Sequence, residues 1–397
     1  MSDGVLHVLT GAYPPQTGGV SDYCAAVASG FSDVGVPIHI WSSGVPAGDL
    51  PAELPGVALH RLPALFSVRG LRRLARALDQ TSAPRVLLLQ YSPNVLGWRG
   101  MNLFACLWLL MRSRRDEVRV MFHEPYFYFS LRHPLYNVLA VVQRLMAVAL
   151  LGASRQVYVS SSTWVSRLRP YMWFGDRPLQ WLPVPANVPR CDDEAAVQRC
   201  RHELSGGNPG VRVVGHFGTY GAHVRSVLEP CLAALAARDS RLRVACLGRH
   251  SAAFARDLAS RVPALRGRVV ASGGLASTEV SAWIRACDVM VQPFLDGVTT
   301  RRGSLMAALV NGAPTVTTVG ALTEAFWLQE DGIVLAPAGD APGLADRVIE
   351  LLGDETRRRA LGSAAADLYE RRFSVRHSVQ RLHAGAADSS ASGFQAS

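Results

Sequence analysis

Short runs of apolar residues alternate with longer amphipathic segments along most of the chain. Five runs in the first half have the length and residue types of buried strands: Val5–Thr10, Pro37–Trp41, Val86–Gln90, Arg119–Phe122 and Gln156–Ser160. The segments between them have helical spacing, and the first such segment begins at about Ser21. Strands and helices that alternate in this way indicate a parallel sheet covered by helices on both faces.

A proline-rich stretch divides this pattern in two. Trp181–Arg190 contains three prolines, which exclude regular structure, so we place the domain boundary there. Six further strand-like runs follow: Arg212–His216, Leu242–Leu247, Arg268–Ala271, Val289–Gln292, Thr315–Thr318 and Ile333–Leu335. The pattern predicts an α/β protein with parallel sheets in two domains, residues 1–185 and 186–375. The last dozen residues of the remaining segment, 376–397, have the composition of a disordered tail.

The net charge of +10 comes from arginine alone, because the 397 residues include no lysine. Residues 1–190 carry 18 arginines and 10 acids, whereas residues 191–397 carry 23 and 21. This excess favours an anionic partner for the first domain, either phosphates or a membrane surface. A bias toward arginine with a solvated basic face explains the charge equally well. Nucleic acid is not expected as a partner, since no nucleic-acid-binding motif accompanies the charge.

The apolar runs are too short or too interrupted to predict a membrane-spanning helix, which needs about 18 residues. The best candidates are Met101–Met111 and Leu135–Ala153, of which the second contains Gln143 and Arg144. Seven scattered cysteines without a Cys-x-x-Cys pair, and a start without a basic leader, predict a cytoplasmic protein. The aromatic and leucine-rich segment 98–112 fits either docking on an anionic membrane at its inner face or packing against the sheet.

A glycine pair follows the first predicted strand. Gly18 and Gly19 lie in the loop before the first helix, where a backbone without side chains lets a phosphate approach the helix N-terminus. The spacing is not Gly-x-Gly-x-x-Gly, and the second strand ends in Trp41-Ser42-Ser43 without an acid, so a nicotinamide dinucleotide is disfavoured. A tight turn with no ligand remains an alternative.

His123 comes directly after the strand Arg119–Phe122, at the sheet edge where open α/β sheets bind ligands. With Glu124 beside it, the histidine is a candidate functional residue or a member of a structural pair.

A third motif follows the strand Val289–Gln292. Asp296 is followed by Arg301 and Arg302, and a helix is expected to begin near Gly303 and Ser304. Two guanidinium groups beside a helix N-terminus suit the charges of a nucleoside diphosphate, although a solvated surface loop has the same composition.

Together these motifs resemble those of a retaining glycosyltransferase of the GT-B fold, in glycosyltransferase family 4. The opening loop from Tyr13 to Tyr23 is similar to that of the family, and Leu182–Val188 resembles its interdomain junction. The family's donor-domain series follows in order: Val213–Gly218, Cys246–Gly248, Ala286–Val289, Asn311–Pro314 and Asp331–Pro337. The resemblance implies two facing Rossmann-like domains with parallel sheets, a nucleotide sugar held mainly by the second, and a final helix that crosses back to the first.

The resemblance also implies roles for single residues. His123 falls where the family keeps a histidine near the transferred sugar and its phosphate. Gly18 and Gly19 fall in the loop that approaches the diphosphate, and Gly218 belongs to the donor-binding series. The family places an arginine and a lysine on the diphosphate. Here His216 stands near the place of the arginine, and Arg225 is the nearest candidate for the lysine.

The chain departs from the family at its paired acids. The family has a Glu, seven residues and a second Glu, which binds the ribose of the nucleotide. Asp296 is the nearest equivalent of the first, but Ser304 and Ala307 stand near the place of the second. Glu324, in the turn after the strand Thr315–Thr318, is a candidate replacement.

The chemistry of sugar transfer requires neutralisation of the departing diphosphate and alignment of the acceptor. Fixed arginines supply the first, and the chain contains no Asp-x-Asp triplet, so we expect transfer without a metal or another cofactor. We expect His123 and Asp296 to contact the sugar, and the acceptor to be a glycan or a lipid-linked molecule of cell-surface polysaccharide or glycoconjugate synthesis. A non-catalytic partner subunit and a nucleotide-sugar epimerase of the same fold remain alternatives.

Overall fold

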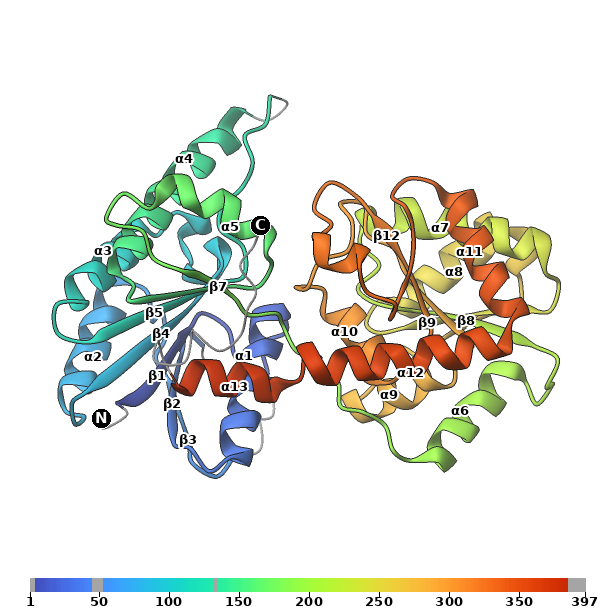
Figure 1. The fold of residues 1–397 in the computed structure, drawn as a ribbon, viewed down its shortest axis with the longest axis horizontal. Helices are drawn as coiled ribbons and strands as arrows, with labels where there is room; N and C mark the ends of the chain where they lie inside the picture. Colours follow the sequence, from blue (N-terminus) through green and yellow to red (C-terminus); the bar gives the residue numbers. More distant parts are fainter. Residues whose placement is uncertain (1–3, 45–52, 132–133, 385–397) are drawn as a thin grey trace. The chain divides into compact units, whose positions relative to one another are not determined.

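The computed structural model describes residues 4–44, 53–131 and 134–384 and divides into two compact units (Figure 1). The first unit comprises the residues up to Pro183 together with those from Val375 onward, and the second comprises Val184–Ser374. The tail predicted for the last dozen residues lies outside the described part of the chain.

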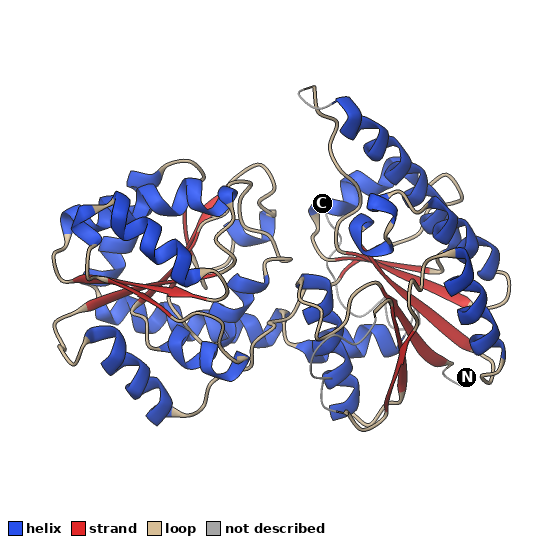
Figure 2. Ribbon diagram, turned by 180° about the vertical axis from the view of Figure 1, so that it is seen from behind, coloured by secondary structure: helices blue, strands red, loops and turns tan. Residues whose placement is uncertain are grey.

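The first unit is built on a parallel sheet with the strand order β3-β2-β1-β4-β5-β6-β7. Its strands are β1 (Val5–Thr10), β2 (Ile38–Ser42), β3 (Val57–Arg61), β4 (Arg85–Tyr91), β5 (Glu117–Phe122), β6 (Gln156–Val159) and β7 (Leu179–Trp181). Helices lie on both faces of the sheet (Figure 2). The predicted α/β class with parallel sheets is confirmed.

Two edge strands were missed in the sequence. β3 has the residues Val-Ala-Leu-His-Arg and β7 has only Leu-Gln-Trp, and neither is a continuous apolar run. Both are only partly buried, because an edge strand has one neighbour and less cover than a central one. The prediction that Trp181–Arg190 is irregular was therefore wrong at Trp181, the last residue of β7.

The helices of the first unit are α1 (Gly19–Asp33), α2 (Val68–Asp79), α3 (Leu103–Arg112), α4 (Pro134–Ala153), α5 (Thr163–Leu168) and the C-terminal α13 (Val375–Ala384), with single 3₁₀ turns η1 (Pro93–Leu96), η2 (Trp98–Gly100) and η3 (Arg169–Tyr171). α13 contacts α1, and Gly30 permits the close approach because a Cβ there would lie 2.8 Å from Val379. Arg119 of β5 also donates to the backbone oxygen of Leu382 at 2.6 Å. The last helix is therefore an integral part of the first unit.

α4 contains an 18-residue window, Tyr136–Ala153, with a mean hydropathy of 1.5, of which half is buried inside the structure. Its length and composition would suffice to cross a membrane, but core helices of globular proteins share them. α4 packs against α3 and β5, and Gln143 in its middle is fully buried and donates to the Gly100 oxygen at 3.2 Å.

The second unit has a six-stranded parallel sheet with the order β10-β9-β8-β11-β12-β13. Its strands are β8 (Arg212–Phe217), β9 (Leu242–Leu247), β10 (Val269–Ala271), β11 (Val289–Gln292), β12 (Thr315–Val319) and β13 (Val334–Pro337). All six correspond to predicted strands. The strand order reverses direction between β8 and β11, and ligands of open α/β sheets bind at the carboxyl ends of the strands at such a point.

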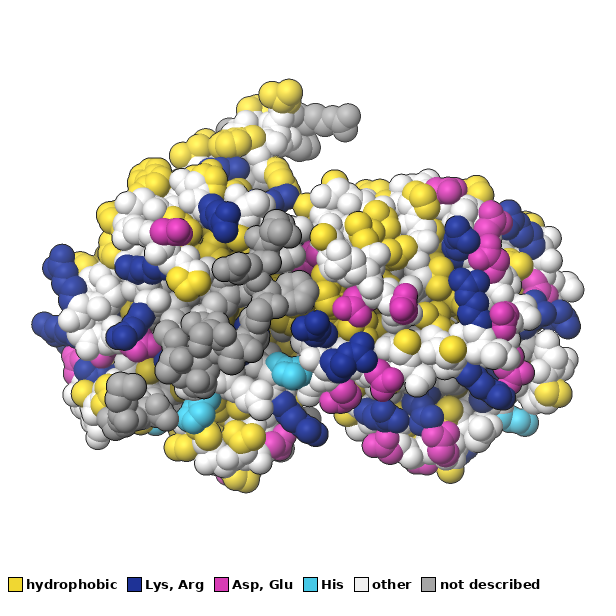
Figure 3. All heavy atoms as spheres, in the orientation of Figure 1, with side chains coloured by type: hydrophobic (Ala, Val, Ile, Leu, Met, Phe, Trp, Pro, Cys, Tyr) yellow, Lys and Arg dark blue, Asp and Glu magenta, His cyan; other side chains and the backbone are white. Residues whose placement is uncertain are grey.

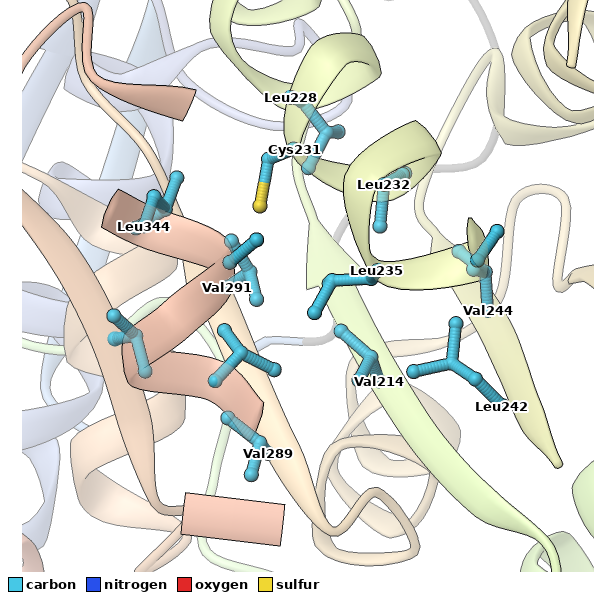
Figure 4. Close-up of a cluster of buried hydrophobic side chains, with 14 of the residues drawn as sticks. Val214, Leu228, Cys231, Leu232, Leu235, Leu242, Val244, Val289, Val291 and Leu344 are labelled. Carbon is cyan, nitrogen blue, oxygen red and sulfur yellow. The ribbon is translucent and has the colours of Figure 1, made fainter. Parts of the chain in front are cut away.

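Helices cover both faces of this sheet: α6 (Glu194–Ser205), α7 (Ala222–Arg238), α8 (Ser251–Arg261), α9 (Ser277–Arg285), α10 (Gly303–Val310), α11 (Ala341–Gly353) and α12 (Glu355–Arg372), with the 3₁₀ turns η4 (Pro263–Leu265) and η5 (Ala325–Leu328). On one face, Leu228, Leu232 and Leu235 of α7 meet strand residues such as Val214 and Val291 (Figure 4). These side chains are at most 1% exposed. Their packing fixes the strand ends that carry the polar groups described next.

Candidate active site

The loop between β11 and α10 starts at the carboxyl edge of the second sheet and is held there by two threonines of β12. Thr317 Oγ1 donates to the Gln292 backbone oxygen at 2.6 Å. Thr318 Oγ1 donates to the Phe294 oxygen at 2.6 Å and accepts from the Phe294 N–H at 2.7 Å. Because both threonines are fully buried, these bonds fix the start of the loop against the neighbouring strand.

Glu324 fixes the middle of the same loop. Its carboxylate accepts hydrogen bonds from both the backbone N–H and the side-chain hydroxyl of Thr300, the latter at 2.9 Å. Glu324 is 1% exposed and Thr300 is fully buried. The Thr300 backbone oxygen accepts from the Val184 N–H at 3.2 Å, so this residue is held on both sides. Glu324 thus holds the segment 293–302, which carries Arg301 and Arg302 and which we call the arginine loop. The predicted contact of Glu324 with a ribose stays a prediction.

The predicted charges of the loop lie together in space. Asp296 forms ion pairs with Arg302 and, at 3.4 Å, with Arg301. The Arg302 guanidinium also lies over the Phe294 ring, 4.6 Å from its centroid. The side chains of Asp296, Arg301 and Arg302 are all partly exposed. Such an arrangement can bind an anion if the arginines exchange the carboxylate for phosphate oxygens.

The loop after β11 approaches the loop after β12 so closely that only glycine fits between them. Gly297 has a φ of +92°. A Cβ on Gly320 would lie 2.7 Å from the Asp296 carbonyl carbon and 2.8 Å from the Gly297 nitrogen. Substitution at either glycine would separate the two loops and displace Asp296 from its position.

Gly303 and Ser304 form the first turn of α10, where the leading N–H groups of a helix lack intrahelical partners. Arg302 is the N-cap residue of this helix, so its side chain starts directly beside the helix N-terminus. Ala307, which stands near the place of the family's second acid, is fully buried in the core. A carboxylate at position 307 would therefore be buried among apolar groups.

His216 and Gly218 lie at the carboxyl end of β8, beside β11. The His216 Nδ1 donates to the Val291 backbone oxygen at 2.8 Å, so Nε2 carries the lone pair of the neutral ring. Burial lowers the pKa of His216 to about 4 against the opposing effect of that hydrogen bond. A Cβ on Gly218 would lie 2.9 Å from Nε2, so glycine at 218 keeps the space over the ring open. His216 is consequently a neutral acceptor and not the cation that an arginine would supply.

Gln292 joins the two strands at the same point. With its amide oriented to satisfy both groups, Nε2 donates to the Phe217 oxygen and Oε1 accepts from the Phe217 N–H, each at 3.1 Å.

Arg225 is placed differently from the other predicted donor residues. It lies in the first turn of α7 and donates to Glu229 at 2.8 Å and to Asp257 at 2.9 Å. Two carboxylates therefore already engage its guanidinium, and a phosphate would have to compete with both. The structure does not bring Arg225 to the loop that holds Arg301 and Arg302 through any described contact, and its role on a diphosphate stays a prediction.

In the first unit, His123 lies at the end of β5 with its ring held from two sides. Nε2 donates to the Gln90 side-chain oxygen of β4 at 2.9 Å, and the ring meets Tyr23 of α1 edge-on with a centroid separation of 4.8 Å. The His123 backbone oxygen accepts from Ser160 Oγ and Trp164 Nε1, each at 3.1 Å. Burial lowers the pKa of His123 to about 3, so the ring is neutral at neutral pH. It can accept a hydrogen bond from a sugar hydroxyl through Nδ1 but carries no positive charge.

Gly18 and Gly19 lie at the N-terminus of α1 in the same unit. Both are exposed, and a Cβ at either would meet nothing within 4 Å. Packing therefore does not require glycine here, although the φ of +155° at Gly18 is a conformation that L-residues rarely adopt. Open space in front of a helix N-terminus is what an approaching phosphate needs.

Within the described ranges, no group of three His, Cys, Asp or Glu side chains is placed to share a metal ion. The residues that hold the site but were missed in the sequence are Thr300, Thr317, Thr318, Gln292 and Gln90. For Gln90, Gln292, Thr317 and Thr318 the signal is a polar residue inside a buried strand, because such a side chain must find a hydrogen-bond partner. Thr300 lies in the loop after β11 and has no such signal.

The fold is similar to that of several solved structures. The structure is similar to sucrose-phosphate synthase from Thermosynechococcus elongatus, with a TM-score of 0.69 at 16% identity over 96% of this chain and 98% of that one. It is also similar to HepE of Anabaena in complex with UDP and glucose, with a TM-score of 0.67 at 15% identity over 96% and 98% of the two chains. A third similar structure is WaaG, a glycosyltransferase involved in lipopolysaccharide biosynthesis, with a TM-score of 0.64 at 12% identity over 96% and 100%.

The sequence comparisons give a narrower result. Residues 208–354, within the second unit, match the family described as "Glycosyl transferases group 1". A search of curated proteins finds no significant match. The matched segment contains the arginine loop, Glu324 and the end of β8. The chain therefore has the GT-B fold, and residues 208–354 of its second unit are similar to the group 1 glycosyl transferases.

Proposed function

We propose that the protein is a retaining, metal-independent glycosyltransferase that moves a hexose from a nucleotide-diphosphate sugar to a glycan or lipid-linked acceptor. The proposed setting is cell-surface polysaccharide or glycoconjugate synthesis in the cytoplasm, where its seven free cysteines would stay reduced. The observation that carries the proposal is the arginine loop inside the segment that matches the glycosyltransferase family. The HepE structures with UDP and with UDP-glucose support the proposed donor class.

The arginine loop supplies what a departing diphosphate requires. Thr300 is anchored by Glu324 and Val184, so Arg301 and Arg302 project from a fixed backbone. When a diphosphate binds, the guanidinium groups bond to its oxygens and Asp296 is released toward the sugar. Preorganised cations stabilise the charge that develops as the sugar–phosphate bond breaks.

The proposed transfer is balanced without a further reactant. The bond between the anomeric carbon and the diphosphate oxygen breaks, and the electron pair stays on that oxygen. The acceptor hydroxyl forms the new bond on the same face of the sugar, and its proton goes to the departing diphosphate oxygen. We propose that His123 binds a sugar hydroxyl as a neutral acceptor, in line with the burial that lowers its pKa to about 3.

The decisive experiment incubates the full chain with a panel of nucleotide sugars, with and without cell-extract acceptors, and measures nucleotide release and sugar products. Acceptor-dependent nucleotide release supports the proposal. Conversion of the nucleotide sugar without an acceptor would identify an epimerase instead. Donor binding without any turnover would identify a non-catalytic subunit. The absence of the family's second acid would agree with that result.

A further inference from the structure

The outer face of α3 is apolar over its whole length. Phe104, Leu107 and Met111 follow one another at helical spacing and are 38% to 58% exposed. The helix has one charged residue, Arg112, which is buried in ion pairs with Asp79 and Asp116. A helix that faces water normally has polar residues along this side.

α4 repeats this pattern beside it. Val138, Val141 and Leu145 are spaced by three and four residues and are 43% to 58% exposed. α3 and α4 pack against each other, and we call their two exposed stripes together the α3–α4 face. Hydrophobic side chains gather over α4 in the space-filling view (Figure 3).

Exposed aromatic side chains lie in the first turn of α4 and on loops and turns of the same unit. Six are more than half exposed: Trp98, Tyr128, Phe129, Tyr136, Trp173 and Phe174. Arg144 lies among them, with its guanidinium carbon 4.1 Å from the centroids of the Tyr126 and Phe129 rings. Aromatic and arginine side chains with an apolar body and a polar end are typical of the membrane–water interface.

The neighbouring helix α2 shows that this is not a general property of the unit. α2 contacts α3, but its outer side carries the exposed arginines Arg69, Arg72, Arg73 and Arg76. α2 is thus an ordinary amphipathic helix in water, and the change to an apolar surface occurs at α3.

The basic charge of the first unit lies in the same segment as the apolar face. Residues 92–175 contain ten arginines and three acids, a net charge of +7, whereas residues 1–91 contain six of each. Exposed arginines stand at the ends of the two helices: Arg99 before α3, Arg114 and Arg115 after it, and Arg155 after α4. Of the three acids, Asp116 and Glu117 are paired with arginines.

We propose that the α3–α4 face docks on the surface of an anionic lipid bilayer, with the apolar stripes at acyl-chain depth and the arginines at the headgroups. The coincidence of apolar area and positive charge selects this occupant. A second copy of the chain is disfavoured, because an isologous contact would bring the same +7 segment against itself. As a consequence that rests on the proposed function, the acceptor is lipid-linked and is presented at the membrane.

The test is co-sedimentation of the full chain with vesicles of phosphatidylcholine, with or without phosphatidylglycerol. We expect binding to the anionic vesicles that weakens as salt is added. The double variant Leu107→Glu/Val141→Glu should bind roughly tenfold or more weakly. Val34→Glu, at another exposed apolar position of the same unit, should bind as the wild type does. Replacement of Arg114 or Arg115 by glutamine should weaken anionic binding roughly fivefold each.

If the two glutamates disturb folding, the milder double variant Leu107→Ser/Val141→Ser replaces them, with its fold checked by circular dichroism. This variant should also bind anionic vesicles more weakly than the wild type. Absence of wild-type binding to anionic vesicles at low salt would overturn the proposal. So would equal binding by Leu107→Glu/Val141→Glu and Val34→Glu, or a lipid-free dimer that those glutamates dissociate. None of these measurements uses a nucleotide sugar, so their failure is distinct from a failure of the proposed transfer.

Discussion

Replacement of Glu324 by alanine removes the carboxylate that anchors the arginine loop without touching either arginine. The Thr300 N–H and hydroxyl would lose this acceptor inside a fully buried site. A buried donor that loses its partner costs about 1–3 kcal/mol, so two donors give about 2–6 kcal/mol. Glu324→Gln keeps the side-chain volume and can still bond to both Thr300 groups, so it should cost only about 1 kcal/mol, from the loss of charge assistance.

The assay combines denaturant unfolding of the full chain with hydrogen exchange of peptides that cover residues 298–304. Glu324→Ala should lower the unfolding free energy and speed exchange in those peptides, and it should weaken donor binding because Arg301 and Arg302 lose their fixed backbone. Glu330→Ala, in the same connection but partly exposed, is the matched control and should change stability by less than about 0.5 kcal/mol.

A double-mutant cycle isolates the contact itself. Thr300→Val removes the hydroxyl, and its coupling with Glu324→Ala should be about 1–2 kcal/mol. Additive effects of the two changes, or unchanged exchange at residues 298–304 in Glu324→Ala, would refute the anchoring role.

Three further predictions concern the charged and titrating groups. Arg301→Ala and Arg302→Ala should each raise the donor dissociation constant roughly 10- to 100-fold by loss of a charge-assisted hydrogen bond. Isothermal titration calorimetry measures this constant, with the exposed Arg347→Ala as control. An unchanged dissociation constant would mean that both arginines are solvated and do not bind the donor. His123→Ala should lower turnover roughly 100-fold while donor binding persists, and near-normal turnover would remove its role at the sugar. Burial lowers the pKa of His123 to about 3 and that of His216 to about 4. As the pH falls, both histidines are therefore protonated in the unfolded chain at a higher pH than in the folded protein. The unfolding free energy should consequently decrease from about pH 6.5 toward pH 4. Unfolding curves that do not change over this range in wild type would contradict the neutral buried state of both rings.

The alternation of apolar runs was sufficient to predict the central strands of both sheets, because a strand buried on both faces is apolar at nearly every position. The edge strands β3 and β7 could not be predicted in this way. Their pattern is mixed because only part of each is covered, and what covers them is set by the rest of the fold.

Part of the candidate site could likewise be predicted from the sequence, and part could not. Asp296, Arg301 and Arg302 could be proposed from sequence because they are close along the chain and follow a recognisable strand. The link between Thr300 and Glu324, 24 residues apart, depends on β11 and β12 being neighbours in the sheet. Arg225 shows the reverse case. Its place in the sequence predicts a contact with the diphosphate, but in the folded protein its guanidinium donates to the carboxylates of Glu229 and Asp257.

By itself, the sequence determined the α/β class, most strands and the charge that the chain brings to any partner. These are local or additive properties, which follow from residue type and spacing. Only the tertiary structure decided which polar groups meet, that His123 and His216 are buried and neutral, and that the basic segment 92–175 also exposes an apolar face. Each of these depends on contacts between residues far apart in the chain, because burial and hydrogen bonding are set by what packs against a side chain and not by its neighbours in sequence.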